Sequence, residues 1–346
     1  MSGRAKAASA AIAAGAVAAG LAGRAAWKRR HPAAADGAWG PPPDDLGPIS
    51  AFDGTGLAVR AAGDPRAPVL LFSHGFSLDM TTWREQWVEL GDAFRCVALD
   101  HRAHGRSGIP ETGDVTIRSM ARDLASVLDA VAPEAPAILV GHSMGAIAIL
   151  ALAEQRPELF GPRVAGVALI GASASDLLRG AMGGVTELLR PRFGSLAAAA
   201  RRVDRLRRAV LAAPRDVPAI VARVTQFAPD APDELVDHVL HLAQRAPSIV
   251  WTDGLSELVS MDLRHALPRV TVPALVAVGD QDRVTPPASA VELAAALPDG
   301  HLFLVEGAGH LAMLERPERL NPELRSFAGA AFAGARRRPR KQEGAA

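Results

Sequence analysis

A serine between two glycines is the residue of this chain with the clearest chemistry. Ser143 lies in the segment Gly141-His142-Ser143-Met144-Gly145, which follows the apolar run 137–140 and precedes an alanine-rich stretch. Strand, G-x-S-x-G and helix in this order predict a sharp turn that exposes the serine oxygen, because only very small residues fit two positions before and after it. The helix that follows would aim free N–H groups at negative charge developing during acyl transfer. The pattern therefore predicts a serine nucleophile.

This motif can arise by chance in a chain with 32 glycines, so the nucleophile needs partners. A serine hydroxyl reacts poorly at neutral pH unless a base takes its proton and an acid orients that base. His310 follows the apolar run 301–305, and Asp282 follows the run 274–278. Because sites in open α/β sheets lie at the carboxyl ends of the strands, we expect Ser143, Asp282 and His310 to meet there. Asp280 is the alternative acid, and we expect it to shape the loop instead.

The elements that must position these residues alternate between short apolar and longer helical segments. Predicted strands cover 56–60, 69–73, 95–99, 137–140, 164–170, 274–278 and 301–305, and predicted helices cover 80–90, 117–131, 146–155, 288–297 and the stretch from 317. Strands rich in Val, Leu and Ile without polar interruptions favour a parallel sheet covered on both faces. The repeated strand–helix–strand order predicts an α/β fold with a mostly parallel, doubly wound sheet.

The domain organisation follows from where the alternation of strands and helices is interrupted. Residues 174–265 read as helical with frequent prolines, and they predict a cap inserted between two core strands, over the active site. The core is then expected in two parts, 49–173 and 266–332. The N-terminal part, 1–48, precedes the core. Within it, residues 33–48 are rich in Pro, Gly and Asp, and we expect them to form a linker without helix or strand. Residues 333–346 are expected to be a basic disordered tail.

The N-terminal run 7–23 carries no charge and is flanked by basic residues. It is barely long enough to cross a membrane, which takes about 20 apolar residues. Three interpretations stay open: a weak signal-anchor, an alanine-rich tail, and a cleaved secretory signal. If the run spans, the heavier Lys/Arg count after it places the catalytic domain on the cytoplasmic side. The chain is accordingly expected to be cytoplasmic or to contact a membrane through this segment.

Composition argues against nucleic-acid binding, against a disulfide within the chain and against a metal site. The formal net charge is +1, so no overall field favours nucleic acid, and we expect no nucleic-acid partner. The one cysteine, Cys96, lies in a predicted buried strand and cannot form a disulfide within the chain. The histidines lack metal-ligand spacing such as H-E-x-x-H, so neither a metal nor a cofactor is expected.

Four motifs carry a resemblance to a known family. They are Ser73-His74-Gly75-Phe76, the segment from Asp100 to Ser107 (DHRAHGRS), Gly279-Asp280-Gln281-Asp282 and Gly307-Ala308-Gly309-His310. With Ser143, and with the chain order serine, aspartate, histidine, they are similar to the motifs of the α/β-hydrolase superfamily over about residues 49–332. One departure is Ala103, which stands where the family usually has glycine. The resemblance implies an oxyanion hole made by the backbone N–H groups of Phe76 and Met144.

Other polar residues near these motifs are expected to be structural. His74 would orient the oxyanion loop, and His142 would pack beside the helix after the serine. His104 and Arg102 would organise their turn through hydrogen bonds. Glu306 and Glu315 flank the loop of His310, where we expect a surface or supporting role.

The resemblance implies hydrolysis of a carboxylic ester of a small to medium apolar substrate through an acyl-enzyme. The serine at position 143, in the strand-to-helix turn (the nucleophile elbow), argues against haloalkane dehalogenases and epoxide hydrolases, which use aspartate there. The segment 74–79 also resembles cofactor-free haloperoxidases and esterases, which form peracids through the same acyl-enzyme. Acyltransfer and a non-catalytic binding role are further alternatives, although binding relatives typically lack one or more residues of the triad.

Overall fold

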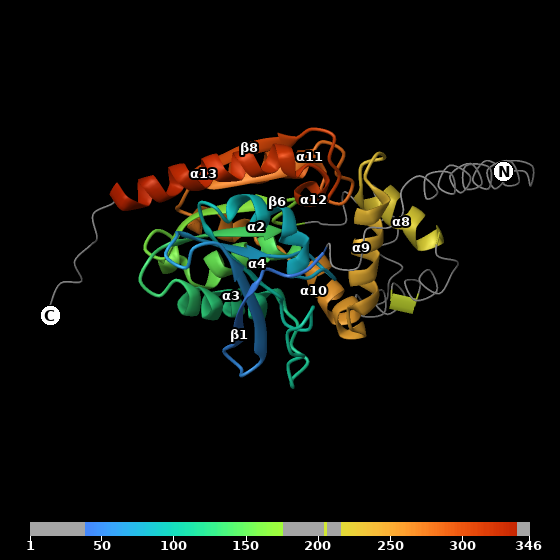
Figure 1. Cartoon of the computed structure of the whole chain (residues 1–346), viewed down its shortest axis with the longest axis horizontal. Helices are drawn as coiled ribbons and strands as arrows, with labels where there is room; N and C mark the ends of the chain where they lie inside the picture. The colour runs from blue at the N-terminus through green and yellow to red at the C-terminus, as the bar shows by residue number, and fades with distance from the viewer. Residues whose placement is uncertain (1–38, 176–203, 206–215, 338–346) are drawn as a thin grey trace, which may run out of the picture.

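A computed structural model describes residues 39–175, 204–205 and 216–337, and these residues build one eight-stranded sheet (Figure 1). The strands are β1 (Asp44–Ser50), β2 (Gly56–Ala62), β3 (Val69–Ser73), β4 (Arg95–Leu99), β5 (Ala137–His142), β6 (Val164–Ile170), β7 (Ala274–Gly279) and β8 (Gly300–Val305). Their order is β1-β2-β4-β3-β5-β6-β7-β8. Only β2 runs antiparallel to its neighbours β1 and β4, and the other pairs are parallel. The mostly parallel α/β sheet predicted from the sequence is confirmed.

Helices cover both faces of the sheet because successive strand side chains point to opposite sides. In β3, Leu71 joins the core with α3 (Ile117–Val131), α4 (Met144–Gln155) and α11 (Pro287–Ala296). Its neighbours Leu70 and Phe72 join the opposite core with α2 (Arg84–Leu90), α12 (Ala312–Glu315) and α13 (Pro317–Arg337). Such two-sided burial explains why the strands read as unbroken apolar runs.

The expectation that residues 33–48 hold no strand is wrong for residues 44–48, which belong to β1. The strand lies at the sheet edge, where Pro48 needs no partner for a missing N–H. A register shift between Asp45 and Pro48 accommodates Gly47, whose φ is 72°. Ion pairs then fasten the strand to the sheet, from Asp45 to Arg60 and from Asp44 to Arg95.

The predicted boundary of the C-terminal tail also needs correction. Helix α13 continues to Arg337, so residues 333–337 are helical and not part of a disordered tail. Arginines at 336 and 337 occupy the last turn, where positive charge interacts favourably with the helix dipole. The remaining tail residues, 338–346, lie outside the described residues.

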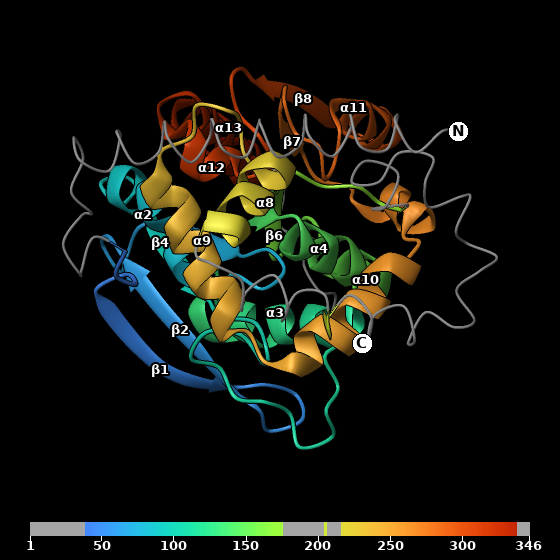
Figure 2. The same ribbon diagram turned by 90° about the vertical axis from the view of Figure 1, so that its right-hand side faces the viewer.

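Between β6 and β7, the described chain contains helices rather than strands. They are α8 (Asp216–Gln226), α9 (Asp233–Arg245), the π-helical turn η4 (Val250–Gly254), α10 (Leu255–Ser260) and the 3₁₀ helix η5 (Arg264–Arg269). Figures 1 and 2 show α8, α9 and α10 gathered at one end of the sheet. Residues 176–203 and 206–215 of the predicted cap lie outside the described part of the chain.

The predicted N-terminal run 7–23 likewise lies outside the described residues. Among the helices that the structure does describe, none is both long and apolar enough to cross a membrane.

Cys96 lies in β4 and is fully buried, as expected from its apolar surroundings. Burial raises the pKa of its thiol to about 12. The thiol is therefore protonated at neutral pH and unreactive, because the thiolate is the nucleophilic form.

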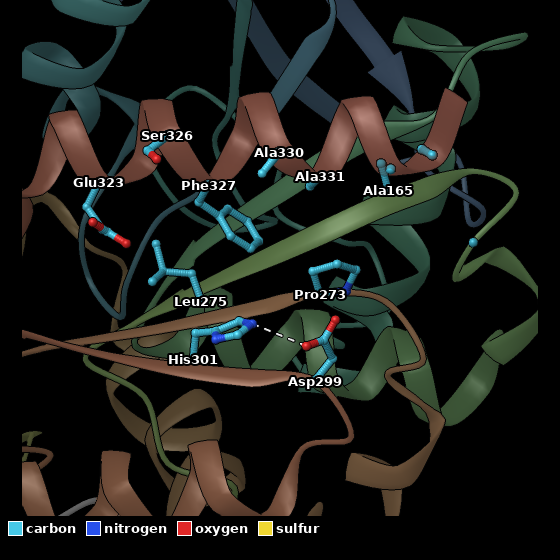
Figure 3. Close-up of a pocket in the computed structure, with 13 residues that line it drawn as sticks. Ala165, Pro273, Leu275, Asp299, His301, Glu323, Ser326, Phe327, Ala330 and Ala331 are labelled. Atoms are coloured by element: carbon cyan, nitrogen blue, oxygen red, sulfur yellow. Dashed lines mark ion pairs between the residues drawn. The ribbon is translucent and has the colours of Figure 1, made fainter. Parts of the chain in front are cut away.

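A pocket of about 320 Å³ lies between α13 and strands β6 to β8 (Figure 3). It is lined near the sheet by Ala165, Pro273 and His301, which lie at the amino ends of these strands. The residues predicted to be catalytic follow the carboxyl ends of strands, at the opposite edge of the sheet. The pocket therefore does not contain the predicted site.

Candidate active site

Ser143 occupies a strained turn between β5 and α4. Its φ is 49° and its ψ is −113°, a conformation that costs about 1–3 kcal/mol for a residue other than glycine. The surroundings hold it there, since its N–H donates to the carbonyl of Ile170 at 2.9 Å and its own carbonyl accepts from Ile147. The residue is 6% exposed and directly precedes a twelve-residue helix. This is the strand–turn–helix geometry that the motif predicts.

The two glycines of the motif are required by close backbone approach. A Cβ at Gly145 would lie 2.1 Å from the carbonyl oxygen of Ser73, and one at Gly141 would lie 2.5 Å from the nitrogen of Ala146. Each of these distances is far below a normal van der Waals contact. The turn can therefore form only where both positions lack a side chain.

Replacing Gly145 with alanine is expected to lower the free energy of unfolding by about 1–3 kcal/mol, because the new methyl group must push α4 away from the end of β3. Urea unfolding of the purified variant measures this loss. Gly329→Ala is the matched control, since Gly329 is an exposed position in α13 with no atom within 4 Å of its Cβ site. The control should be as stable as the natural chain or more so, and equal losses in the two variants would contradict the packing argument.

Asp282 and His310 form a direct pair. Nδ1 of His310 lies 2.8 Å from Oδ2 of Asp282, and both side chains are buried. The other carboxylate oxygen accepts the N–H groups of Val284 and Thr285, and the hydroxyl of Thr285 donates to Oδ2. Burial alone would raise the pKa of Asp282, but the charge of His310 and these hydrogen bonds hold that pKa below its usual value. The carboxylate is therefore ionised at neutral pH and can orient the imidazole.

His310 is held in place through its backbone and by space around its ring. Its N–H donates to the carbonyl of Gln226 at 2.7 Å, and its carbonyl accepts from Nε2 of His142 at 3.0 Å. A Cβ on Gly171 would lie 3.2 Å from two atoms of the imidazole, so the glycine after β6 leaves room for the ring.

The residue before Ser143 in the chain, His142, contacts His310. The ring of His142 lies 4.8 Å from that of His310, centroid to centroid, and His142 is the chain neighbour of Ser143. Within the described residues, Oγ of Ser143 forms no hydrogen bond, either with His310 or with another side chain. Bonds between nucleophile and base are often long without substrate and shorten when it binds. The structure thus joins Asp282 and His310 directly and places His142, the chain neighbour of Ser143, against the ring of His310.

Two backbone N–H groups were predicted to bind an oxyanion. Met144 is the first residue of α4, where an N–H has no acceptor inside the helix. Phe76 lies in the loop after β3, and its N–H has no acceptor among the described residues. Both groups are therefore free to bind a ligand atom.

Buried histidines link the loop of Phe76 to the loop after β4 through hydrogen bonds. His74 donates from Nδ1 to the carbonyl of Gly75 and accepts the N–H of His101 on Nε2. His104 accepts the N–H of Ser77, and His101 bonds to the hydroxyl of Ser73.

Burial keeps these rings neutral. It lowers the pKa of His74 well below its usual range, that of His101 to about 3 and that of His104 to about 4. The pKa of His142 falls to about 3 for the same reason. A neutral imidazole can donate and accept at once, so each ring can link two groups. Their geometry supports the structural roles expected for His74 and His104.

Ala103, which departs from the family pattern, adopts the backbone conformation of a glycine. Its φ is 60°, where an alanine costs roughly 1–2 kcal/mol. The next glycine, Gly105, is needed more strictly, because its Cβ would lie 2.2 Å from a carboxylate oxygen of Asp100. That carboxylate accepts the N–H groups of Met80 and Arg106 and so shapes the turn. Burial raises the pKa of Asp100 to about 7.

Apolar side chains surround the loop of Phe76. Its ring meets that of Trp251 edge to face at 5.0 Å, and it packs against the cluster of Ala103, Val115 and Val250. Trp251 belongs to η4, so a segment far along the chain borders the loop that was predicted to hold an oxyanion.

Three contacts at this site were not predicted. Thr285 bonds to Asp282, and its place three residues after an aspartate is a local signal for such a bond. The carbonyl of Gln226 binds the loop of His310, and nothing in the local sequence indicates this contact. The carboxylate of Glu315 also binds this loop, in line with the supporting role expected for it, although its partners were not predicted. Asp280 does what was expected, since it accepts the N–H of Gly307 in the loop before His310. In the parts of the chain that are described, no group of side chains could hold a metal ion.

Comparison with known proteins gives a consistent picture. The model of the alpha/beta hydrolase family matches residues 69–323, well over half of the chain. A non-heme chloroperoxidase from Streptomyces lividans is 27% identical over 82% of this chain and 99% of its own. Epoxide hydrolase A from Mycobacterium tuberculosis is 37% identical, but the similarity spans only 41% of this chain and 42% of the relative.

Among solved structures, a thermophilic esterase from Thermogutta terrifontis matches with a TM-score of 0.66 and 25% identity. The match covers 84% of this chain and all of the esterase chain.

Proposed function

Since this chain belongs to the alpha/beta hydrolase family, and is an enzyme with the fold of that family, we propose that it cleaves a carboxylic ester of a small to medium apolar substrate through an acyl-enzyme. The observation that carries the proposal is the strained turn of Ser143 beside the ion pair of Asp282 and His310. An ionised aspartate on Nδ1 leaves Nε2 of the imidazole free to accept a proton.

The proposed reaction has two halves. His310 takes the proton of Ser143 as the serine oxygen attacks the ester carbonyl, and the N–H groups of Phe76 and Met144 bind the resulting oxyanion. His310 returns the proton to the leaving alcohol, and the acyl group stays on Ser143. Water then attacks the acyl-enzyme with His310 as the base, which releases the acid and restores the serine. Asp282 stabilises the charged imidazole in both halves.

The proposed cap, residues 174–265, includes the described elements α8, α9, η4 and α10. It contributes Trp251 next to Phe76, so an acyl group held at the oxyanion loop would meet aromatic and aliphatic side chains. Such a lining favours an apolar acyl group, because a charged one would lose its hydration without gaining a partner. This is the support for an apolar substrate.

A second candidate is perhydrolase activity with the same three residues. It is favoured by the similarity to the Streptomyces lividans chloroperoxidase, which extends over nearly the full length of that protein. The partial similarity to an epoxide hydrolase is weaker support for epoxide hydrolysis, because this chain has a serine at the nucleophile elbow.

The proposal is tested by offering the natural chain a series of nitrophenyl esters from acetate to decanoate, with separate labelling by a fluorophosphonate. We expect turnover and one phosphonyl group, located on Ser143 by mass spectrometry. Halogenation that appears on addition of peroxide and halide would favour the second candidate. A chain that neither turns over any ester nor reacts with the phosphonate would refute both and leave a binding role.

A further inference from the structure

Glu315 ends the short helix α12, and its buried side chain accepts hydrogen bonds from three backbone amides of the described residues. One carboxylate oxygen accepts the N–H groups of Gly309 at 3.0 Å and Leu311 at 3.2 Å, on either side of His310. The other accepts the N–H of Ala228 at 2.7 Å. Burial raises the pKa of Glu315, while these three hydrogen bonds and the charge of Arg316 oppose the rise.

Ala228 belongs to the segment that leaves α8, and this segment lies directly on the loop of His310. The carbonyl of Gln226 accepts the N–H of His310, and a Cβ on Gly309 would lie 2.7 Å from atoms of Gln226, Phe227 and Ala228. Figure 2 shows α8 next to α12. The segment 226–228 is therefore the place where the proposed cap touches the loop that carries the proposed base.

We infer that Glu315 is the positioning residue that joins the cap to His310, so that the place of the imidazole depends on the place of segment 226–228. This inference rests on the proposed function, because it gives His310 the role of base. The chemistry suits a carboxylate, which offers acceptors only and here meets three donors. A glutamine must turn its NH₂ group toward at least one of these N–H groups and repel it.

The first test compares Glu315→Gln with Glu306→Gln. Glu306 flanks the same loop but is exposed and pairs with Arg319, so it is a matched control. In Glu315→Gln, kcat for the best ester is expected to fall up to about 100-fold, because a displacement of about 1 Å can cost that much. KM should stay within about twofold, because the apolar side chains around Phe76 that are proposed to bind the acyl group are unchanged. Rates are expressed per serine titrated with the phosphonate, so a smaller folded fraction does not imitate the effect.

Amide hydrogen exchange supplies a measurement that does not depend on turnover. In Glu315→Gln, exchange should rise together in residues 226–228 and 309–311, since one carboxylate protects both segments. A rise confined to one segment, or a kcat equal to that of Glu306→Gln, would overturn the inference. If the natural chain hydrolyses no ester, the proposed function fails while the exchange result still decides whether Glu315 joins the two segments.

A second variant reaches the same contact from the other side. Gly309→Ala keeps Glu315 but places a methyl group 2.7 Å from segment 226–228, which forces this segment and the His310 loop apart. It should show the same fall in kcat with little change in KM. An unchanged kcat in a folded Gly309→Ala variant would contradict the inference even if Glu315→Gln cannot be purified.

Discussion

Replacing Ser143 with alanine is expected to lower kcat for ester hydrolysis by at least about 10⁴-fold, because no other described group can take the place of the serine oxygen. Alanine fills the same strained backbone position, whose φ is 49°, at the same cost, so the fold should survive. Initial rates with the best ester, together with circular dichroism of the purified variant, measure both effects. Residual turnover would reflect only the oxyanion donors and substrate binding.

Ser326→Ala is the control for this variant. Ser326 lies on α13 and lines the pocket at the amino ends of the strands (Figure 3), whereas the proposed site is at their carboxyl ends. Its replacement should leave turnover unchanged. A Ser143→Ala variant that keeps the rate of the natural chain, and a phosphonate adduct on another residue, would remove Ser143 from the mechanism.

Replacing Asp282 with asparagine is expected to lower kcat/KM by about 10⁴-fold at neutral pH through the wrong tautomer of His310. One carboxylate oxygen accepts two backbone N–H groups, so the amide oxygen must take that place. The amide NH₂ then faces Nδ1 of His310, which has to become an acceptor. The proton moves to Nε2, and the imidazole can no longer accept the proton of Ser143.

Asp280→Asn is the matched control, because Asp280 was the alternative acid. Its carboxylate bonds to the N–H of Gly307 and not to His310, so its loss should cost less than about tenfold in kcat/KM. The comparison uses pH–rate profiles of both variants and the natural chain. A larger loss in Asp280→Asn than in Asp282→Asn would reverse the assignment of the acid.

The sequence predicted those parts of the fold that depend on local pattern. Strands β3, β4 and β6 begin and end at the predicted residues, because mostly apolar runs that are buried on both faces leave little ambiguity. Strand β1 was missed, since Asp, Pro and Gly disfavour strands in isolation. Its extended form comes from pairing with β2 and from ion pairs of Asp44 and Asp45 with distant arginines.

In the candidate site too, some contacts could be predicted from local pattern and others could not. The contact between Asp282 and His310 could be predicted because each follows a strand, and parallel strands bring their carboxyl ends to one edge of the sheet. The role of Ser143 beside them stays a prediction. The contacts of Gln226 and Glu315 could not be predicted, because they join segments that only the folded chain places together. The position of Trp251 beside Phe76 could not be predicted either, because the pattern of a helix shows which of its faces is buried but not where on the sheet it docks.

The buried thiol of Cys96 makes this chain convenient for spectroscopy. Its pKa of about 12 and its place in a fully covered strand keep it from reacting with maleimides at neutral pH. A cysteine introduced at Val224, which is 58% exposed on α8, would therefore be the single reactive thiol without removal of the natural one. One fluorophore at that position would report movement of the proposed cap in an otherwise unaltered enzyme.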